Sequence, residues 1–404
     1  MREQQSITAE EAAAILGISR ATLYAYVSRG LIRSEAAGDG SRRHRYAAAD
    51  VEALRQRREQ QRNPSVAVEG ALDWGAPLLE SSITLIDNGR LYYRGQDATV
   101  LALNASLEEA AGLIWTGQLE TAPFAHVVQR LPERWEAGEG LSPIIRFQAV
   151  LPQASAANAA AYDLRPEGVM ASSARIMHLF TRLLSGVWPG DEGIAAALQA
   201  GWNLQPKTRR VLNAALVLCA DHELNVSAFT ARCIASAAAT PYAVVQGGLA
   251  ALEGTRHGGH TERVEALFLE VGRPEEADEV IAARLRRGDS LPGFGHPLYP
   301  QGDPRARLLL ELVEDCCPRS AAWELASAVT GAAEGLLGLR PTIDFALVTA
   351  ARALDLPPGS PLALFALGRT VGWIGHALEQ YAAGTLIRPR ARYVGDWPEA
   401  ETGP

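Results

Sequence analysis

Apolar residues recur at the three- and four-residue spacing of amphipathic helices through most of the chain after residue 106. This spacing predicts helices over residues 107–115, 172–184, 208–220, 228–239, 261–269 and 345–354. A strand signal precedes them, because alternating positions in residues 82–95 flank Asn88-Gly89, a dipeptide typical of a two-residue hairpin turn. The chain has no βαβ alternation and no internal repeat, so we expect a mainly α fold.

The first 62 residues follow a different pattern, with two short helices around a tight turn. Thr8 and Glu11 are spaced as a capping box at the start of the first helix. Gly17 is suited to end that helix, and Ser19 to cap the next one. This arrangement predicts a helix-turn-helix.

Residues 30–32 and 41–46 predict a β-hairpin wing, and an arginine-rich helix is expected from residue 49 to about 62. The module (1–62) resembles the MerR-like or excisionase-like winged helix-turn-helix, which implies contacts with duplex DNA. The candidate contacts are Arg20 and Thr22 on the second helix and Arg42, Arg43 and Arg45 on the wing. The alternative is a docking or dimerising appendage that never touches DNA.

Composition supports this division of the chain. The 404 residues are 48% hydrophobic and 21% charged, which is ordinary for a globular protein. The net charge of −8 is uneven, because residues 1–64 hold 11 arginines against eight acidic residues. Only this head therefore suits nucleic acid. Residues 63–75 are the expected linker.

The four cysteines form no CxxC pair and have no metal-ligand spacing. Scattered cysteines of this kind predict reduced thiols in a cytoplasmic protein without a bound metal. The N-terminus lacks the apolar region of a signal peptide, and no run of about 18 apolar residues predicts a membrane span.

One histidine stands in a stretch that can form neither a helix nor a regular strand and is therefore a loop. His296 lies within LPGFGHPLYPQGDPR (residues 291–305), whose glycines and prolines bend the backbone. Asp303 and Arg305 follow it, so the loop is suited to present an imidazole and a cation to a ligand. On this stretch alone, a surface turn with an incidental histidine is the alternative.

Two further stretches favour the functional interpretation. GTRHGGH (residues 254–260) places His257 in a second loop, and RPTIDF (residues 340–345) contains the lone carboxylate of Asp344. The three stretches, in this order, resemble the catalytic set of the citrate synthase family: a GxxHGG loop, a GFGHxxYxxxDPR loop and an aspartate of the xVD type. The resemblance extends from about residue 76 to the end.

The resemblance implies all-α large and small subdomains over residues 76–404, the small one at roughly 260–350. It implies a homodimer that condenses an acyl-CoA with oxaloacetate, with coenzyme A thioester as substrate and no permanently bound cofactor. His257, His296 and Asp344 are the implied catalytic residues. The implied substrate-binding residues are His222 in DHELNVS, Arg305, Arg369, and Arg388, which in the family reaches the partner subunit's site.

Four of these residues also have a simpler interpretation. Asp344 alone could be a helix N-cap, and His222 could cap a helix C-terminus. Arg369 lies in a nearly apolar segment, where it needs either a ligand carboxylate or an acidic neighbour. Arg388 could be an ordinary solvated arginine of the tail.

Several positions depart from the family pattern. His260 and Thr261 follow the HGG motif, Thr342 stands where asparagine is common, and Pro297 and Pro300 replace residues that are often basic. The arginines at 284, 286 and 287 are possible replacement cations for coenzyme A. Two functions therefore stay open: a citrate or 2-methylcitrate synthase, and a transcriptional regulator that uses the synthase fold to sense a metabolite.

Overall fold

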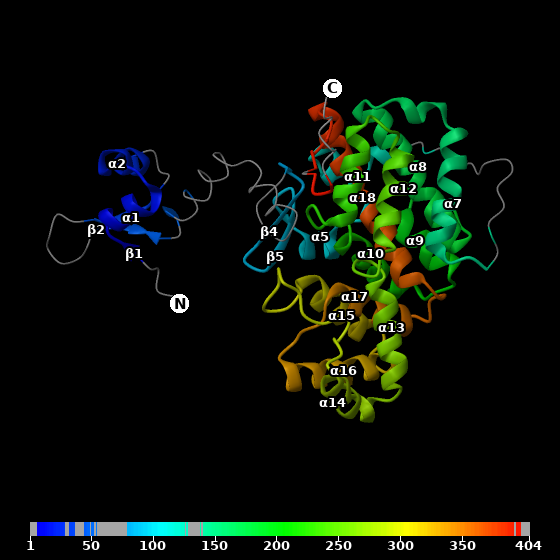
Figure 1. Ribbon diagram of the computed structural model, residues 1–404. Helices are drawn as coiled ribbons and strands as arrows, with labels where there is room; N and C mark the ends of the chain where they lie inside the picture. The colour runs from blue at the N-terminus through cyan, green and yellow to red at the C-terminus, as the bar shows by residue number, and fades with distance from the viewer. Residues whose placement is uncertain are drawn as a thin grey trace, which may run out of the picture. The chain divides into compact units, whose positions relative to one another are not determined.

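The computed structural model describes residues 6–28, 32–36, 44–48, 50, 51, 54, 79–125, 127, 138, 140–391 and 393–396. The chain divides into two compact units, Met1–Glu80 and Ser81–Pro404, drawn in Figure 1. No helix in these described ranges is long and apolar enough to cross a membrane.

The first unit combines two helices with a three-stranded antiparallel sheet in the order β1-β3-β2. Its elements are β1 (Ser6–Ile7), α1 (Ala9–Leu16), α2 (Arg20–Ser28), β2 (Ser34–Ala36) and β3 (His44–Ala47). The capping box of Thr8 and Glu11 is present, and Gly17 ends α1 in the left-handed conformation. Ser19 Oγ accepts the backbone N–H of Thr22 at 3.2 Å, so it caps α2. The predicted helix-turn-helix is confirmed.

The wing differs in detail from the prediction. Its first strand, β2, begins at Ser34, whereas Ile32 is buried in a small core with Leu23 and Tyr46. An apolar residue is better placed in that core than on an exposed hairpin. Arg42 and Arg43 lie outside the described residues, as does most of the helix expected over residues 49–62.

The second unit begins with the predicted hairpin. β4 (Thr84–Asp87) pairs with β5 (Arg90–Tyr93), which also pairs with β6 (Gln96–Asp97). Asn88 and Gly89 have φ values of 48° and 73°. Both central residues are left-handed, as the tight hairpin turn requires.

The rest of this unit is helical, as predicted. The helices are α5 (Ala98–Asn104), α6 (Leu107–Thr116), α7 (Pro143–Ala156), α8 (Pro166–Ser185), α9 (Gly193–Gly201), α10 (Arg209–Leu218), α11 (Val226–Ser236), α12 (Pro241–Leu252), α13 (His260–Val271), α14 (Ala277–Arg287), α15 (Pro304–Cys316), α16 (Ala321–Leu337), α17 (Ile343–Ala353) and α18 (Ser360–Ala383). Helix α18 is buried over most of its length and packs against α6, α8, α10, α11 and α12.

Two hydrophobic cores organise these helices. The larger one surrounds α18, and the smaller one joins α13, α14 and α16, with α15 and α17 lying between the two groups (Figure 1). Helix α17 serves both cores, since Leu347 packs in the larger core and Phe345 and Val348 in the smaller. The helix that carries Asp344 therefore lies at their junction.

Candidate active site

Backbone hydrogen bonds join the His296 loop to the start of α17. Gly295 N donates to Arg340 O at 2.9 Å, and Thr342 N donates to Gly293 O at 2.8 Å. Two segments about 45 residues apart therefore form one hydrogen-bonded framework, which holds His296 on one side and Asp344 on the other.

Two glycines allow this close approach. Gly293 and Gly295 have φ values of 83° and 73°, in the region that favours glycine. A Cβ atom at Gly293 would lie 2.8 Å from a methyl group of Val264 and 3.0 Å from Cβ of Phe345. The loop can therefore lie directly on α13 and α17 only with glycine at this position.

Asp303 strengthens the same junction. Its carboxylate accepts two hydrogen bonds from the guanidinium of Arg305, at 2.9 and 2.8 Å, and one from the backbone N–H of Ile343 at 3.1 Å. Arg305 is only 3% exposed and also lies over the ring of Tyr299, 5.5 Å from its centroid. Asp303 thus holds the guanidinium of Arg305, which is predicted to bind the substrate, in a fixed position.

Asp344 is not the cap of α17. Thr342 occupies the N-cap position, and Asp303 supplies the oxygen that accepts the free N–H of Ile343. The half-buried carboxylate of Asp344 has its own backbone N–H as a hydrogen-bond partner, and it forms no ion pair with another described residue. Burial raises its pKa, while the charges of His260 and Arg305 oppose that shift. The helix-cap interpretation is therefore wrong.

The structure brings His222 and His296 together, with ring centroids 5.3 Å apart in an edge-to-face arrangement. Burial, followed by the charge of Arg305, lowers the pKa of His296 to about 4 and holds that of His222 well below 6.5. Both rings are therefore neutral near pH 7. The backbone N–H of Leu298 donates to Nδ1 of His296 at 3.2 Å, which leaves the ring proton of His296 on Nε2.

Tyr299 contacts His222 directly, and sequence reasoning missed it. Its hydroxyl lies 2.9 Å from Nε2 of His222, so His222 bonds to a side chain of another loop and caps no helix. Tyr299 stands inside the GFGHxxYxxxDPR motif, and this position could have marked it as a candidate site residue. The partner could not be read from the sequence, because His222 lies 77 residues earlier.

His257 has a second unpredicted neighbour, Ser227. Ser227 Oγ lies 2.8 Å from Nε2 of His257 and also receives the indole N–H of Trp373 at 3.1 Å. Burial is the main cause that lowers the pKa of His257 to about 4, and the charge of Arg369 adds to it. His257 is therefore neutral near pH 7.

Arg369 is a buried cation without a carboxylate partner among the described residues. It is 1% exposed, its Nε donates to the carbonyl oxygen of Cys219 at 2.7 Å, and its guanidinium lies 4.7 Å from the ring centroid of Phe365. The ring of Phe365 also meets that of His257, 6.1 Å away. Burial lowers the pKa of Arg369, although the charge of Asp221 opposes this shift. Pairing with an acidic neighbour, the simpler interpretation, is therefore wrong.

Arg388 does not join this group within its own chain. It is exposed and follows Gly384, where α18 ends. In the part of the chain that the structure describes, it forms no hydrogen bond or ion pair with the other predicted site residues. Arg20, Thr22 and Arg45 belong to the first unit, where Arg20 forms an ion pair with Glu10.

Two of the arginines considered as replacement cations are already engaged. Arg284 and Arg287 both pair with Glu270, and Arg287 also pairs with Asp289. Within the described ranges, no group of three histidine, cysteine or acidic side chains is placed to hold a metal ion. Cys219, Cys233, Cys316 and Cys317 form no disulfide.

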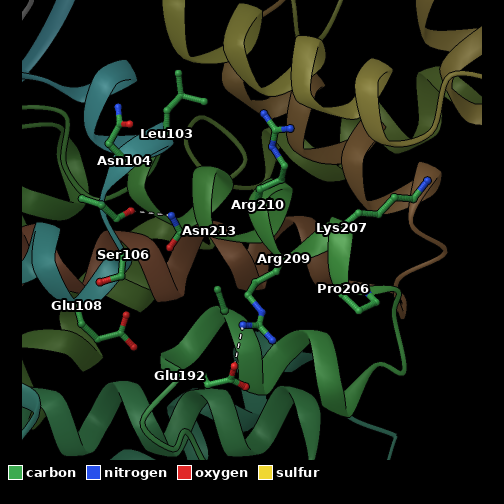
Figure 2. Close-up of a pocket in the computed structure, with 12 residues that line it drawn as sticks. Leu103, Asn104, Ser106, Glu108, Glu192, Pro206, Lys207, Arg209, Arg210 and Asn213 are labelled. Carbon is green, nitrogen blue, oxygen red and sulfur yellow. Dashed lines mark hydrogen bonds and ion pairs between the residues drawn. The ribbon is translucent and has the colours of Figure 1, made fainter.

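A cavity of about 460 Å³ lies elsewhere on the second unit, beside the start of α10. Figure 2 shows an ion pair within it between Arg209 and Glu192, and a hydrogen bond from Asn213 to the backbone. None of the predicted catalytic or substrate-binding residues lines it. The histidine cluster is therefore separate from this cavity.

Neutral buried histidines, a desolvated carboxylate and two buried arginines at the junction of two cores are typical of an enzyme that binds an anionic substrate. Comparison with known proteins agrees with this class. The family model "Citrate synthase, C-terminal domain" matches residues 71–390, and the model "Helix-turn-helix domain" matches residues 6–59. The chain belongs to the citrate synthase family.

Relatives and solved structures show the same relationship. "Citrate synthase 2" of Bacillus subtilis is 30% identical over 351 residues, covering 80% of this chain and 94% of that protein. "2-methylcitrate synthase" of Mycobacterium tuberculosis is 28% identical and covers 76% of this chain and 84% of its own length. The crystal structure of citrate synthase from Thermotoga maritima superposes with a TM-score of 0.69 at 27% identity, covering 81% of this chain and 96% of that one.

Proposed function

We propose that this chain condenses an acyl-CoA with oxaloacetate, giving citrate from acetyl-CoA or 2-methylcitrate from propionyl-CoA. The observation that carries the proposal is the hydrogen-bonded framework between the His296 loop and the start of α17. It fixes a neutral imidazole and a desolvated carboxylate on the two sides of one junction. Carbon–carbon bond formation needs both an acid and a base in fixed positions.

The keto acid is a dianion and is bound by His222, Arg305 and Arg369. Arg369 supports this role most strongly, because its buried guanidinium forms no ion pair with a described carboxylate, and the charge of Asp221 only partly offsets its burial. A substrate carboxylate would supply the missing charge. Arg305 is already paired with Asp303, which fixes the orientation of its guanidinium. The pair as a whole offers the substrate a smaller net charge than a lone arginine.

Asp344 is the base that removes a proton from the acyl carbon next to the thioester carbonyl. Its raised pKa makes it a stronger base than an exposed aspartate. His257 donates a hydrogen bond from Nδ1–H to the enolate oxygen that forms. This requires the Ser227 hydroxyl to donate to Nε2 of His257 and not to Asn225 Oδ1, which also lies 2.8 Å away. The enolate carbon then attacks the ketone carbon of oxaloacetate, and His296 Nε2–H donates to the oxygen that becomes the hydroxyl. Water finally cleaves the thioester and releases coenzyme A.

Coenzyme A enters this scheme as part of a substrate, and no permanently bound cofactor is proposed. Pro300 provides no cation at the loop position where a basic residue is common. Arg284 and Arg287 are committed to Glu270, so coenzyme A binding is expected to depend less on this loop than in other members. The free thiols support a reducing, cytoplasmic setting.

Arg388 is proposed to act in a homodimer, at the site of the partner subunit. The segment after α18 exposes apolar side chains, with Leu386 and Tyr393 each 62% exposed and Val394 84% exposed. Such a segment is better accounted for by burial against a second chain than by contact with water. Its position would carry Arg388 towards the other subunit.

A thiol-release assay tests the proposal directly. The full-length protein is incubated with oxaloacetate and either acetyl-CoA or propionyl-CoA, and free coenzyme A is measured. Release that requires both substrates supports a synthase, and the ratio of the two kcat/KM values assigns the acyl group. The absence of release with either thioester, in a protein that binds oxaloacetate, would instead support a metabolite sensor.

The first unit supports a second proposed function, binding of duplex DNA. The observation that favours it is the helix-turn-helix fold with an antiparallel wing. We propose a DNA-binding domain over residues 1–62, a linker over 63–75 and the synthase domain over 76–404. Arg20 and Thr22 would reach base edges, and Arg42, Arg43 and Arg45 would neutralise phosphates.

A further inference from the structure

A hydrogen bond between two loops links His222 to Tyr299. The Tyr299 hydroxyl lies 2.9 Å from Nε2 of His222, and the two rings meet at 63° with centroids 5.6 Å apart. Tyr299 is 2% exposed and His222 is 8% exposed. A bond this well buried fixes the orientation of both rings.

The positions of the protons follow from the available partners. Burial raises the pKa of Tyr299 to about 12, against the opposing charge of Arg305, so the phenol keeps its proton near pH 7. His222 is neutral, because burial holds its pKa well below 6.5. Among the described residues, Nε2 of His222 is the one hydrogen-bond partner of the Tyr299 hydroxyl. If the hydroxyl accepted a hydrogen bond from Nε2–H, its own proton would have no acceptor among the described residues, at a cost in free energy. We therefore infer that the hydroxyl donates to Nε2 and that the ring proton of His222 lies on Nδ1.

We propose that Tyr299 is a positioning residue that holds His222 in its Nδ1-protonated form, so that His222 presents an N–H donor to a carboxylate of the keto acid. The inference rests on the proposed function for the identity of that ligand. In the other tautomer, the Nδ1 lone pair would face the carboxylate and repel it. A neutral ring fixed in this way donates one directed hydrogen bond beside Arg305 and Arg369 and adds no further charge.

The first test reads the tautomer itself. Long-range 1H–15N NMR of histidine-labelled full-length protein, with His222 assigned from a His222→Gln variant, reports which ring nitrogen carries the proton. We expect a protonated Nδ1 in the wild type, and a mixture of tautomers in Tyr299→Phe. A wild-type spectrum with the proton on Nε2 overturns the inference, and this result needs no variant of Tyr299.

The second test measures binding apart from turnover. Calorimetric titration with oxaloacetate should show a Kd about 5- to 20-fold weaker in Tyr299→Phe, the usual loss for one directed hydrogen bond. Tyr381→Phe is the matched control, because the Tyr381 hydroxyl bonds to the backbone oxygen of Ala239 at 2.5 Å, outside the site. An equal loss in both variants, or no loss in Tyr299→Phe, overturns the inference.

The two proposals can fail separately. A wild-type protein that binds oxaloacetate but releases no coenzyme A would overturn the synthase proposal, while the tautomer and the Kd comparison would still decide the role of Tyr299. In an active enzyme, Tyr299→Phe should raise KM for oxaloacetate more than it lowers kcat. A variant that lowers kcat alone would contradict a positioning role.

Discussion

The arginines of the candidate active site and those of the first unit lie in opposite environments. In the second unit, Arg369 is 1% exposed and Arg305 is 3% exposed. In the first unit, the side chains of Arg20 and Arg33 are 54% and 69% exposed. Burying a charge costs several kcal/mol unless it is compensated, whereas an exposed charge is screened and contributes little. The proposed catalysis by the second unit therefore depends on single groups in fixed positions. The proposed DNA binding by the first unit depends on the number of its charges.

The largest expected effect comes from removing one such group. Asp344→Asn keeps the shape of the side chain but cannot accept the proton, so we expect condensation to fall by about 10²- to 10⁴-fold. Oxaloacetate binding should be nearly unchanged, because the base acts on the acyl-CoA. Thiol release and calorimetry measure the two quantities. Turnover near the wild-type rate in this variant would remove Asp344 from the role of base.

Arg388 is an exception that sharpens the comparison, because it is exposed whereas the other predicted substrate-binding residues are buried. If it completes the partner's site, Arg388→Ala and Asp344→Asn chains are each inactive alone but complement each other. An equal mixture should recover about a quarter of wild-type activity, since half of the dimers are hybrids with one intact site. Thiol release after mixing and re-association measures the gain. A verified hybrid dimer without recovered activity would contradict the shared site.

In the first unit, the effect should be graded and dependent on salt. Duplex affinity should fall with a slope of log K against log salt of about −0.9 per neutralised phosphate. Changing Arg42, Arg43 and Arg45 to alanine should flatten this slope by roughly 2–3 units and weaken all sequences alike. Changes at Arg20 or Thr22 should alter sequence preference instead.

A truncated chain supplies the control for that experiment. Removing residues 1–64 should abolish duplex binding and leave condensation intact, because the site lies within the second unit. If the full-length protein shows no duplex binding even at about 50 mM salt, the first unit is only an appendage. That result would also end the regulator interpretation.

The smallest expected effect concerns stability. Burial raises the pKa of Asp344, so its ionised form disfavours the folded state at neutral pH. Asp344→Asn should therefore raise Tm at pH 8. The difference should shrink as the pH falls through the raised pKa, because the wild-type carboxyl then becomes neutral as well.

Asp303→Asn is the matched control and has the opposite sign. Its carboxylate bonds to the buried Arg305 and to the N-terminus of α17, so the substitution should destabilise the protein by about 3–5 kcal/mol. Calorimetric unfolding of both variants between pH 4 and 8 measures the two effects. A loss of stability in Asp344→Asn at pH 8 would show that its carboxylate is not desolvated.

Sequence reasoning succeeded where the signal is local. The Asn88-Gly89 turn, the capping box of Thr8 and Glu11, and the end of α1 at Gly17 each depend on a few adjacent residues, and all are present. The candidate residues came from motifs in three loops, and the structure brings His222 and His296 into contact.

The remaining features depend on contacts between distant segments. The bond from Tyr299 to His222, and that from Trp373 to Ser227, join residues 77 and 146 positions apart. No periodicity or local motif encodes such pairs, because the packing of whole helices decides them. The pairing of Arg305 with Asp303 could have been predicted from the sequence, since both residues stand in one motif. The hydrogen bond from α17 to Asp303 could not.

The central claim is that the second unit makes a carbon–carbon bond between an acyl-CoA and oxaloacetate. The most direct measurement uses 13C NMR with acetyl-CoA labelled at the methyl carbon, in the presence of unlabelled oxaloacetate. We predict that the label appears in a methylene carbon of citrate with wild-type protein and stays in the thioester with Asp344→Asn. If the label stays in the thioester with wild-type protein, and labelled propionyl-CoA also gives no condensation product, the claim is contradicted.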